Sequence, residues 1–321
     1  MVPRVKFWGT RGSIPVALDS SSIKEKIARA VVAAAGRDVH TPDKARAWVE
    51  NELDFAVSHT FGGNSACVQL DAGGPEYLLC DLGSGVRVFG NRVLERDGPG
   101  KANVFHVFMS HVHWDHIMGF PFFAPAYIPG NTIRIYGCHT VIESALRGQQ
   151  AAPCFPVPFD RLGATIEFVT LEPGGSYDVA GWRVTPMLQQ HSGDSYGYRF
   201  VRDGRSIVYT TDSEHKLEDA AETEAVTAFF RDADLVIFDA MYSLADAVSV
   251  KEDWGHSSNV VGVELCQLAN ARHLVLFHHE PAFDDGQIAA IWRETLRFEE
   301  ITRAGRTLRV SAAYDGLEIE L

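Results

Sequence analysis

The sequence predicts an α/β protein in which buried strands end in residues that can bind metal. Continuous apolar runs such as Leu235-Val236-Ile237-Phe238 suit strands covered on both faces, and they alternate with segments of helical periodicity such as 260–269. With 321 residues, of which 46% are hydrophobic, the chain can bury a large core. Histidines and aspartates directly follow several apolar runs, where loops build the sites of sheet-based enzymes. We therefore expect one domain spanning residues 1–321.

Composition limits the class of function. The 42 acidic and 29 basic residues give a net charge of -13, which argues against a protein that holds nucleic acid through a broad basic surface. The five cysteines are scattered without a CxxC pair, so neither a disulfide framework nor a cysteine-based zinc site is expected. The N-terminus lacks the apolar core of a signal peptide, and no run approaches the length of a membrane span. We expect a cytoplasmic protein that does not bind membranes.

The N-terminal part of the chain is expected to carry a helical insert. A first strand at 5–8 stops at the glycine-containing loop 9–13. Within 17–58, apolar residues recur at helical spacing in two segments; Gly36 ends the first, and Thr41-Pro42 opens the second with proline at the first helical position. We interpret 17–58 as a helical hairpin between strands.

The rest of the chain reads as alternating strands and helices. The apolar or alternating runs expected to form strands are 66–70, 77–80, 104–109, 132–136, 166–169, 183–188, 196–201, 207–211, 235–238 and 274–277. The segments with helical signals are 86–94, 141–147, 218–230, 260–269 and 285–299. The aromatic segment 120–125 is broken by prolines, and it either walls a substrate pocket or packs in the core.

One cluster of polar residues dominates the sequence. Ser110-His111-Val112-His113-Trp114-Asp115-His116 directly follows the apolar run 104–109. In an extended segment His111 and His113 project the same way, and Asp115 and His116 follow where the chain can turn into a helix. Neutral imidazole and carboxylate are ligands of zinc and similar divalent ions. A solvated polar loop is the weaker interpretation, because unpaired groups of this kind near a buried strand end are costly.

Three more apolar strands end near similar residues. These residues are His191, Asp212 and His278. Four separate chain segments are therefore candidates to converge on one metal centre.

Together these motifs resemble the metallo-β-lactamase-fold hydrolases, and within them the phosphodiesterase branch that includes ribonuclease Z and the cyclic phosphodiesterases of phosphonate breakdown. The segments typical of that branch are Phe7-Trp8-Gly9-Thr10-Arg11-Gly12-Ser13, Gly62-Gly63-Asn64-Ser65 and Gly255-His256-Ser257-Ser258. The resemblance covers most of the chain and implies a four-layer αβ/βα sandwich. The helical insert at 17–58 has no counterpart in the family core, and we expect it to cover the pocket or to form a homodimer contact.

The resemblance implies a dinuclear metal site. The ligands of one ion would be His111, His113 and His191. The ligands of the other would be Asp115, His116 and His278. Asp212 would bridge both ions, which are expected to be Zn²⁺, with Mn²⁺ or iron as alternatives.

The resemblance also implies catalytic roles. A hydroxide bridging the ions would be the nucleophile, oriented by Asp115. His256, in its Gly-His-Ser context, would assist the leaving alkoxide by proton donation or charge stabilisation. The alternative is that His256 only caps or packs locally at the start of a helix. Asp81 resembles the family's aspartate behind the site, with an ordinary turn carboxylate as the alternative.

The expected function is hydrolysis of small or cyclic phosphodiesters. Hydrolysis of carboxylic esters, thioesters or lactones on the same site is the alternative, because zinc can polarise a carbonyl instead. A non-catalytic metal sensor or a di-iron oxidoreductase is less favoured, since no flavin-type partner domain is visible. The chain also lacks the long Gly/Pro-rich basic arm that grips tRNA in ribonuclease Z, so tRNA 3′ processing is not expected.

Overall fold

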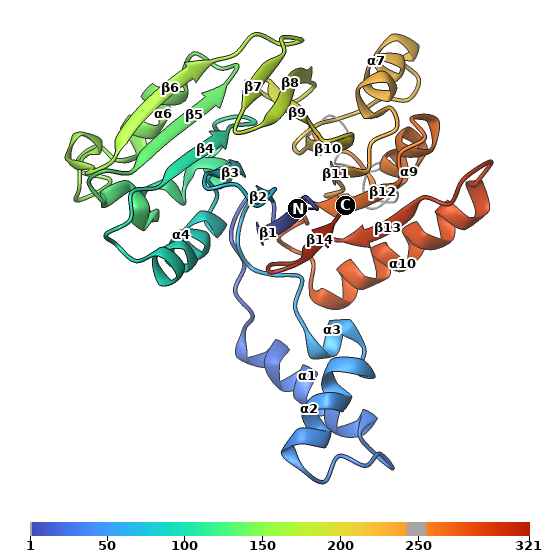
Figure 1. The fold of residues 1–321 in the computed structure, drawn as a ribbon. Helices are drawn as coiled ribbons and strands as arrows, with labels where there is room; N and C mark the ends of the chain where they lie inside the picture. The colour runs from blue at the N-terminus through green and yellow to red at the C-terminus, as the bar shows by residue number, and fades with distance from the viewer. Residues whose placement is uncertain (1, 243–254) are drawn as a thin grey trace.

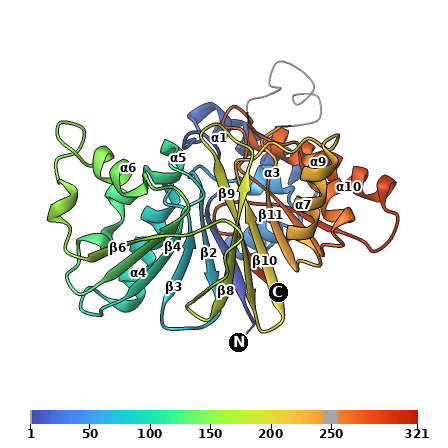
Figure 2. The ribbon, with the colours of Figure 1, turned by 90° about the horizontal axis from the view of Figure 1, so that it is seen from above.

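The structure, a computed structural model that describes residues 2–242 and 255–321, confirms the α/β sandwich. Two seven-stranded sheets pack face to face, and helices cover their outer faces (Figures 1 and 2). The strand order is β14-β1-β2-β3-β4-β5-β6 in the first sheet and β13-β12-β11-β10-β9-β8-β7 in the second. Among the described residues, no helix has both the length and the apolarity that a membrane span needs.

Each sheet has a parallel half and an antiparallel half. The strands of the first sheet are β1 (Arg4–Gly9), β2 (Cys67–Asp71), β3 (Tyr77–Cys80), β4 (Val104–Phe108), β5 (Thr132–Gly137), β6 (Thr165–Thr170) and β14 (Glu318–Glu320). Those of the second are β7 (Tyr177–Val179), β8 (Trp182–Gln189), β9 (Ser195–Arg202), β10 (Arg205–Thr210), β11 (Leu235–Asp239), β12 (His273–Phe277) and β13 (Arg309–Ala312). Strands β3 to β6 run parallel, as do β10 to β13. Their carboxyl ends therefore meet at one edge of each sheet.

Three apolar layers hold the sandwich together. Side chains such as Phe7, Phe108 and Ile237 fill the space between the sheets. The outer face of the first sheet packs on α4 (Gly85–Asp97) and α6 (Ile142–Gln149), and that of the second on α7 (Ala220–Phe230), α9 (Asn259–Leu268) and α10 (Asp285–Thr302). Because the central strands are covered on both faces, they read as continuous apolar runs.

The aromatic segment after the histidine cluster packs mainly in the core. It forms two short 3₁₀ helices, η1 (Phe120–Phe122) and η2 (Ala124–Tyr127), and a third, η3 (Phe159–Arg161), lies further along the chain. Phe120 and Phe123 are fully buried, and Phe123 packs edge-on against Phe105 with 5.2 Å between ring centroids. Phe122 is 57% exposed. Of the two interpretations of this segment, core packing therefore fits most of its aromatic residues.

The insert at 17–58 is helical and projects from the sandwich (Figure 1). It contains α1 (Ser20–Ala33), α2 (Pro42–Asn51) and α3 (Phe55–Ser58). Asp19 caps α1, and Thr41 caps α2, which begins with Pro42 as predicted. Phe55 of α3 packs against Phe61 and Tyr314 and joins the insert to the sandwich.

Candidate metal centre

The candidate site lies where strands of both sheets end. His111 and His113 follow β4 and precede the single-turn helix α5 (Trp114–Ile117), which carries Asp115 and His116. His191 follows β8, Asp212 follows β10, and His278 follows β12. The structure thus brings all seven residues of the expected ligand set to one place, in two groups.

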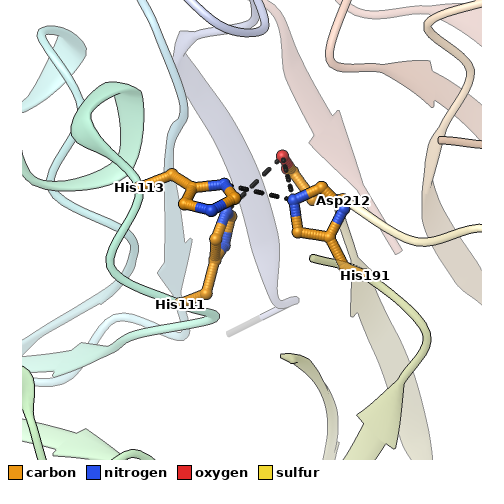
Figure 3. A group of neighbouring side chains, drawn as sticks. All are labelled: His111, His113, His191 and Asp212. Atoms are coloured by element: carbon orange, nitrogen blue, oxygen red, sulfur yellow. Dashed lines mark hydrogen bonds and ion pairs between the residues drawn. The ribbon is translucent and has the colours of Figure 1, made fainter. Parts of the chain in front are cut away.

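The first group contains three histidines and one carboxylate. His111, His113, His191 and Asp212 point their polar atoms toward one another (Figure 3), and these atoms lie within 4.8 Å of each other. Nε2 of His191 is 3.1 Å from Nδ1 of His113. Oδ2 of Asp212 is 3.6 Å from Nε2 of His111 and 3.7 Å from Nε2 of His191.

The second group shares Asp212 with the first. It contains Asp115, His116, His278 and Asp212. Oδ1 of Asp212 is 3.0 Å from Nε2 of His116 and 3.1 Å from Nε2 of His278. Oδ2 of Asp115 is 3.2 Å from the same nitrogen of His278. Asp212 therefore presents one oxygen to each group, which is the geometry of a bridging carboxylate.

The donor set fits two divalent cations. Nε2 of His111 is buried and lacks a hydrogen-bond partner among the described residues, although such a nitrogen normally has one. Burial lowers the pKa of His111 well below its usual value, so its imidazole is neutral and can donate a lone pair. Burial opposes a charge on His116, but the carboxylates of Asp212 and Asp115 outweigh it and raise the pKa of His116 well above the usual value. The second group is therefore an environment that favours positive charge.

Asp81 lies behind the second group, as the resemblance implied. Its Oδ2 accepts a hydrogen bond from Nδ1 of His116 at 2.8 Å, which leaves Nε2 of His116 facing the group. Asp81 also accepts hydrogen bonds from the backbone N–H and hydroxyl of Ser110 and from the hydroxyl of Tyr209. This network, in which only Tyr209 was not singled out from the sequence, fixes the orientation of His116.

Other backbone contacts hold the remaining residues. Nδ1 of His191 donates to the carbonyl of Gly255 at 2.7 Å, which directs Nε2 of His191 toward the first group. The backbone N–H of Ser13 donates to Oδ2 of Asp115 at 2.8 Å. The glycine-containing loop 9–13 is thus a part of the site.

Two residues of the site adopt backbone conformations that side chains rarely occupy. Asp81 has φ of 60° and His278 has φ of 59°. Left-handed conformations of this kind cost free energy and concentrate at functional sites. Gly12 packs so close to His278 that a Cβ there would lie 2.6 Å from Nδ1 of that imidazole. The glycine is therefore required by the position of His278.

His256 lies beside both groups and pairs with Asp239. Its Nδ1 is 2.8 Å from Oδ2 of Asp239, and its ring lies 5.2 Å from the rings of His191 and His278. Burial disfavours a charge on His256, but Asp239 outweighs it and raises the pKa of His256 to about 9. At neutral pH His256 therefore carries a proton next to the candidate metal centre.

Sequence analysis missed Asp239. The signal was present, because Asp239 directly follows the apolar run 235–238 and ends β11, just as His278 directly follows the apolar run that forms β12. Asp239 is fully buried and also accepts hydrogen bonds from the backbone N–H groups of Ser213 and Met241.

Two neighbouring histidines stay outside the groups. His279 turns away from the site and donates through Nε2 to the carbonyl of Ala313 at 2.8 Å, so His278 and not His279 belongs to the second group. His215, which follows Asp212 by three residues, pairs through Nδ1 with Glu222 at 3.2 Å.

Comparisons with known proteins agree with this fold. The family model described as beta-lactamase superfamily domain matches residues 77–279, well over half of the chain. A ribonuclease Z of Bradyrhizobium diazoefficiens is 23% identical over 305 residues, covering 80% of this chain and 94% of the relative. The metallo-β-lactamase fold protein YhfI from Bacillus subtilis has a TM-score of 0.64 at 17% identity over the full length of both chains. A diphosphatase of the PhnP family has a TM-score of 0.59 at 18% identity, covering 99% of this chain and 98% of that one.

Proposed function

The chain belongs to the beta-lactamase superfamily as a metal-dependent hydrolase, and from this premise we propose that it is a phosphodiesterase acting on small or cyclic phosphodiesters. The proposed metal ligands are His111, His113 and His191 for one ion and Asp115, His116 and His278 for the other. Asp212 is the proposed bridge. Zn²⁺ is the proposed ion, with Mn²⁺ or iron as alternatives that the same donors accept.

The observation that carries the proposal is the charged His256–Asp239 pair beside the two groups. Departure of an alkoxide from phosphorus needs a proton or a neighbouring positive charge, and an imidazolium supplies either. In the metal-free protein the pKa of about 9 keeps His256 protonated across the neutral range, and Asp239, 2.8 Å from its Nδ1, favours the protonated imidazole.

The mechanism assigns a distinct task to each residue. Two divalent ions, when bound, supply activated water and neutralise charge on the phosphoryl oxygens. His256 gives its proton to the leaving oxygen, while Asp239 keeps the imidazole charged and holds its Nδ1–H. Asp115, held at Oδ2 by the backbone of Ser13, orients the attacking water. Asp81 keeps His116 in the tautomer that faces the site.

The charge of the chain supports a small substrate. A net charge of -13 repels a long polyanion, whereas a small phosphodiester can be neutralised within the site. Processing of an RNA 3′ end is the second candidate, because the matched ribonuclease Z aligns over 94% of its length. Hydrolysis of a carboxylic ester or lactone is a third candidate function, but it gives the protonated His256 no role comparable to assisting an alkoxide that leaves phosphorus.

A substrate panel tests the proposal. Protein loaded with Zn²⁺ or Mn²⁺ is assayed on bis-p-nitrophenyl phosphate, cyclic nucleotides, p-nitrophenyl acetate, a lactone and a tRNA precursor. We expect the phosphodiesters to have the highest kcat/KM of the panel. His256→Ala should lower the kcat/KM for phosphodiesters about 100-fold while the metal content stays constant. His40→Ala, a change at an exposed histidine of the insert, is the control and should leave both unchanged. Faster turnover of the ester, the lactone or the precursor would reject the proposal.

A further inference from the structure

The loop 9–13 contains a buried arginine. Arg11 is 2% exposed, although an arginine side chain is rarely buried so completely. Its Nε donates to the carbonyl of Gly62 at 2.9 Å, and its Nη1 donates to the carbonyls of Glu280 at 3.1 Å and Phe283 at 2.8 Å. One guanidinium group therefore joins its own loop to two segments that are distant from it in the chain.

Burial of this charge is costly. It lowers the pKa of Arg11 despite the opposing effect of the carboxylates of Asp285 and Asp315. An apolar side chain of similar volume would pack at lower cost. What only the guanidinium supplies is a planar fork of donors that reaches carbonyls of both segments at once.

The backbone of the loop pairs with the segment that follows His278. The N–H of His279 donates to the carbonyl of Thr10 at 3.0 Å, and the N–H of Gly12 donates to the carbonyl of His279 at 3.0 Å. Gly12 in turn packs against the imidazole of His278, whose left-handed backbone must be held by its surroundings. Arg11 binds the next carbonyls of the same segment, so its guanidinium fixes the stretch of chain on which the position of His278 depends.

The same loop also holds a carboxylate of the second group. The N–H of Ser13 donates to Oδ2 of Asp115 at 2.8 Å, and that oxygen lies 3.2 Å from Nε2 of both His116 and His278. Two members of the second group, Asp115 and His278, are therefore positioned through the loop 9–13.

We propose that Arg11 is a positioning residue for the second group: its guanidinium holds the loop 9–13 and the segment after His278 in the arrangement in which Asp115 and His278 bind one metal ion. The inference rests on the proposed function, in which these two residues are metal ligands. The first group should not depend on Arg11, because its three histidines follow β4 and β8.

A second set of contacts keeps the same segments together when Arg11 is changed. Oδ1 of the buried Asp285 accepts hydrogen bonds from the N–H of Phe61 at 2.8 Å and the hydroxyl of Thr60 at 3.1 Å. Oδ2 of Asp285 lies 2.7 Å from the ammonium group of Lys26. Since none of these contacts involves the guanidinium, Arg11→Lys should still fold.

Zinc titration of the full-length protein, in competition with a chromophoric chelator, tests the inference. His113→Ala removes one ligand of the first group and so assigns the two binding events. Arg11→Lys keeps the positive charge but loses the fork of donors. It should weaken binding at the second group about 10-fold and leave binding at the first group unchanged.

Arg199→Lys is the matched control. Arg199 also donates to two backbone carbonyls, those of Phe229 at 2.6 Å and Arg231 at 3.0 Å, and burial lowers its pKa as well. It lies on the outer face of the second sheet, beside the end of α7. Both variants should lower the midpoint of thermal unfolding of the metal-free protein, but Arg199→Lys should leave both zinc affinities unchanged. A selective loss in Arg11→Lys therefore separates positioning from general destabilisation.

Hydrogen exchange in the wild type tests the same coupling without a variant. Coupling between two sites is reciprocal, so zinc at the second group should slow exchange of the Nε–H of Arg11 and leave that of Arg199 unchanged. Three results would overturn the inference alone: unchanged zinc binding at the second group of Arg11→Lys, equal losses at both groups, or exchange at Arg11 that zinc does not slow. A wild type that binds no zinc would overturn the proposed function, and this inference with it.

Discussion

The pairing of His256 with Asp239 gives a quantitative prediction about pH. Replacing Asp239 with asparagine keeps the shape of the side chain but removes its charge. Without this charge, burial of His256 is opposed only by the more distant carboxylates of Asp212 and Asp115, so the pKa of the imidazole should fall from the value of about 9 that it has in the wild type. A pKa that returned to the usual 6.5 would lower the protonated fraction of His256 at pH 8 from about 90% to about 3%, which sets the limit of the effect.

This change has two measurable consequences. The kcat/KM for a phosphodiester at pH 8 should fall by up to about 30-fold, and it should recover as the pH is lowered toward 6. A pKa raised from 6.5 to about 9 also corresponds to about 3 kcal/mol of stability, which is fully present below pH 6.5 and is lost as the pH rises through 9. The Asp239→Asn variant should not show this loss of stability as the pH rises.

Two experiments provide the assay. NMR titration of His256 in metal-free protein gives its pKa directly; metal-free protein is required because nearby cations would lower that pKa. The pH profile of kcat/KM in metal-loaded protein gives the catalytic effect. If the asparagine variant keeps a His256 pKa near 9, or keeps the wild-type pH profile, then Asp239 does not hold the proton on His256 and the reasoning fails.

Three further predictions concern the metal centre. Asp212→Ala should lose both ions and all activity, because each group uses one oxygen of Asp212; metal analysis that still finds two ions would contradict the bridge. Gly12→Ala should weaken metal binding about 10- to 100-fold, since the new Cβ displaces His278; a metal titration with unchanged affinity would count against that role of Gly12. Removing the metals with a chelator should lower the midpoint of thermal unfolding, and restoring an ion to 100 times its Kd should return about 2.7 kcal/mol of unfolding free energy. Identical melting curves with and without chelator would show that the seven residues hold no ion.

Much of the site could be predicted from sequence because its residues follow strands. An apolar run predicts a buried strand. A histidine or aspartate just beyond that run lies at the sheet edge where other strands also end. His111, His191, Asp212 and His278 obey this rule, and the structure brings them together. Asp239 obeys it as well, but without a recognisable motif around it a single carboxylate after a strand has too many ordinary interpretations.

Other features depend on contacts that sequence does not encode locally. The left-handed backbone of Asp81 and His278 is imposed by tertiary packing, since neither residue type requires it. The periodicity of α1 predicted an apolar face, but not that Lys26 would turn this face toward solvent by pairing with Asp285, 259 positions along the chain. In the aromatic segment 120–125, the sequence pattern did not predict that Phe123 would be buried and Phe122 exposed.

The most direct test of the account is a comparison of two rates at constant metal content. Wild-type protein and His256→Ala, each shown by metal analysis to hold two ions, are assayed on a cyclic nucleotide, whose leaving group is an alkoxide, and on p-nitrophenyl acetate. The account predicts that the wild type prefers the phosphodiester and that His256→Ala loses about 100-fold on the phosphodiester but little on the ester. Equal losses on both substrates, or a wild type that prefers the ester, would contradict a phosphodiesterase that relies on His256 as its acid.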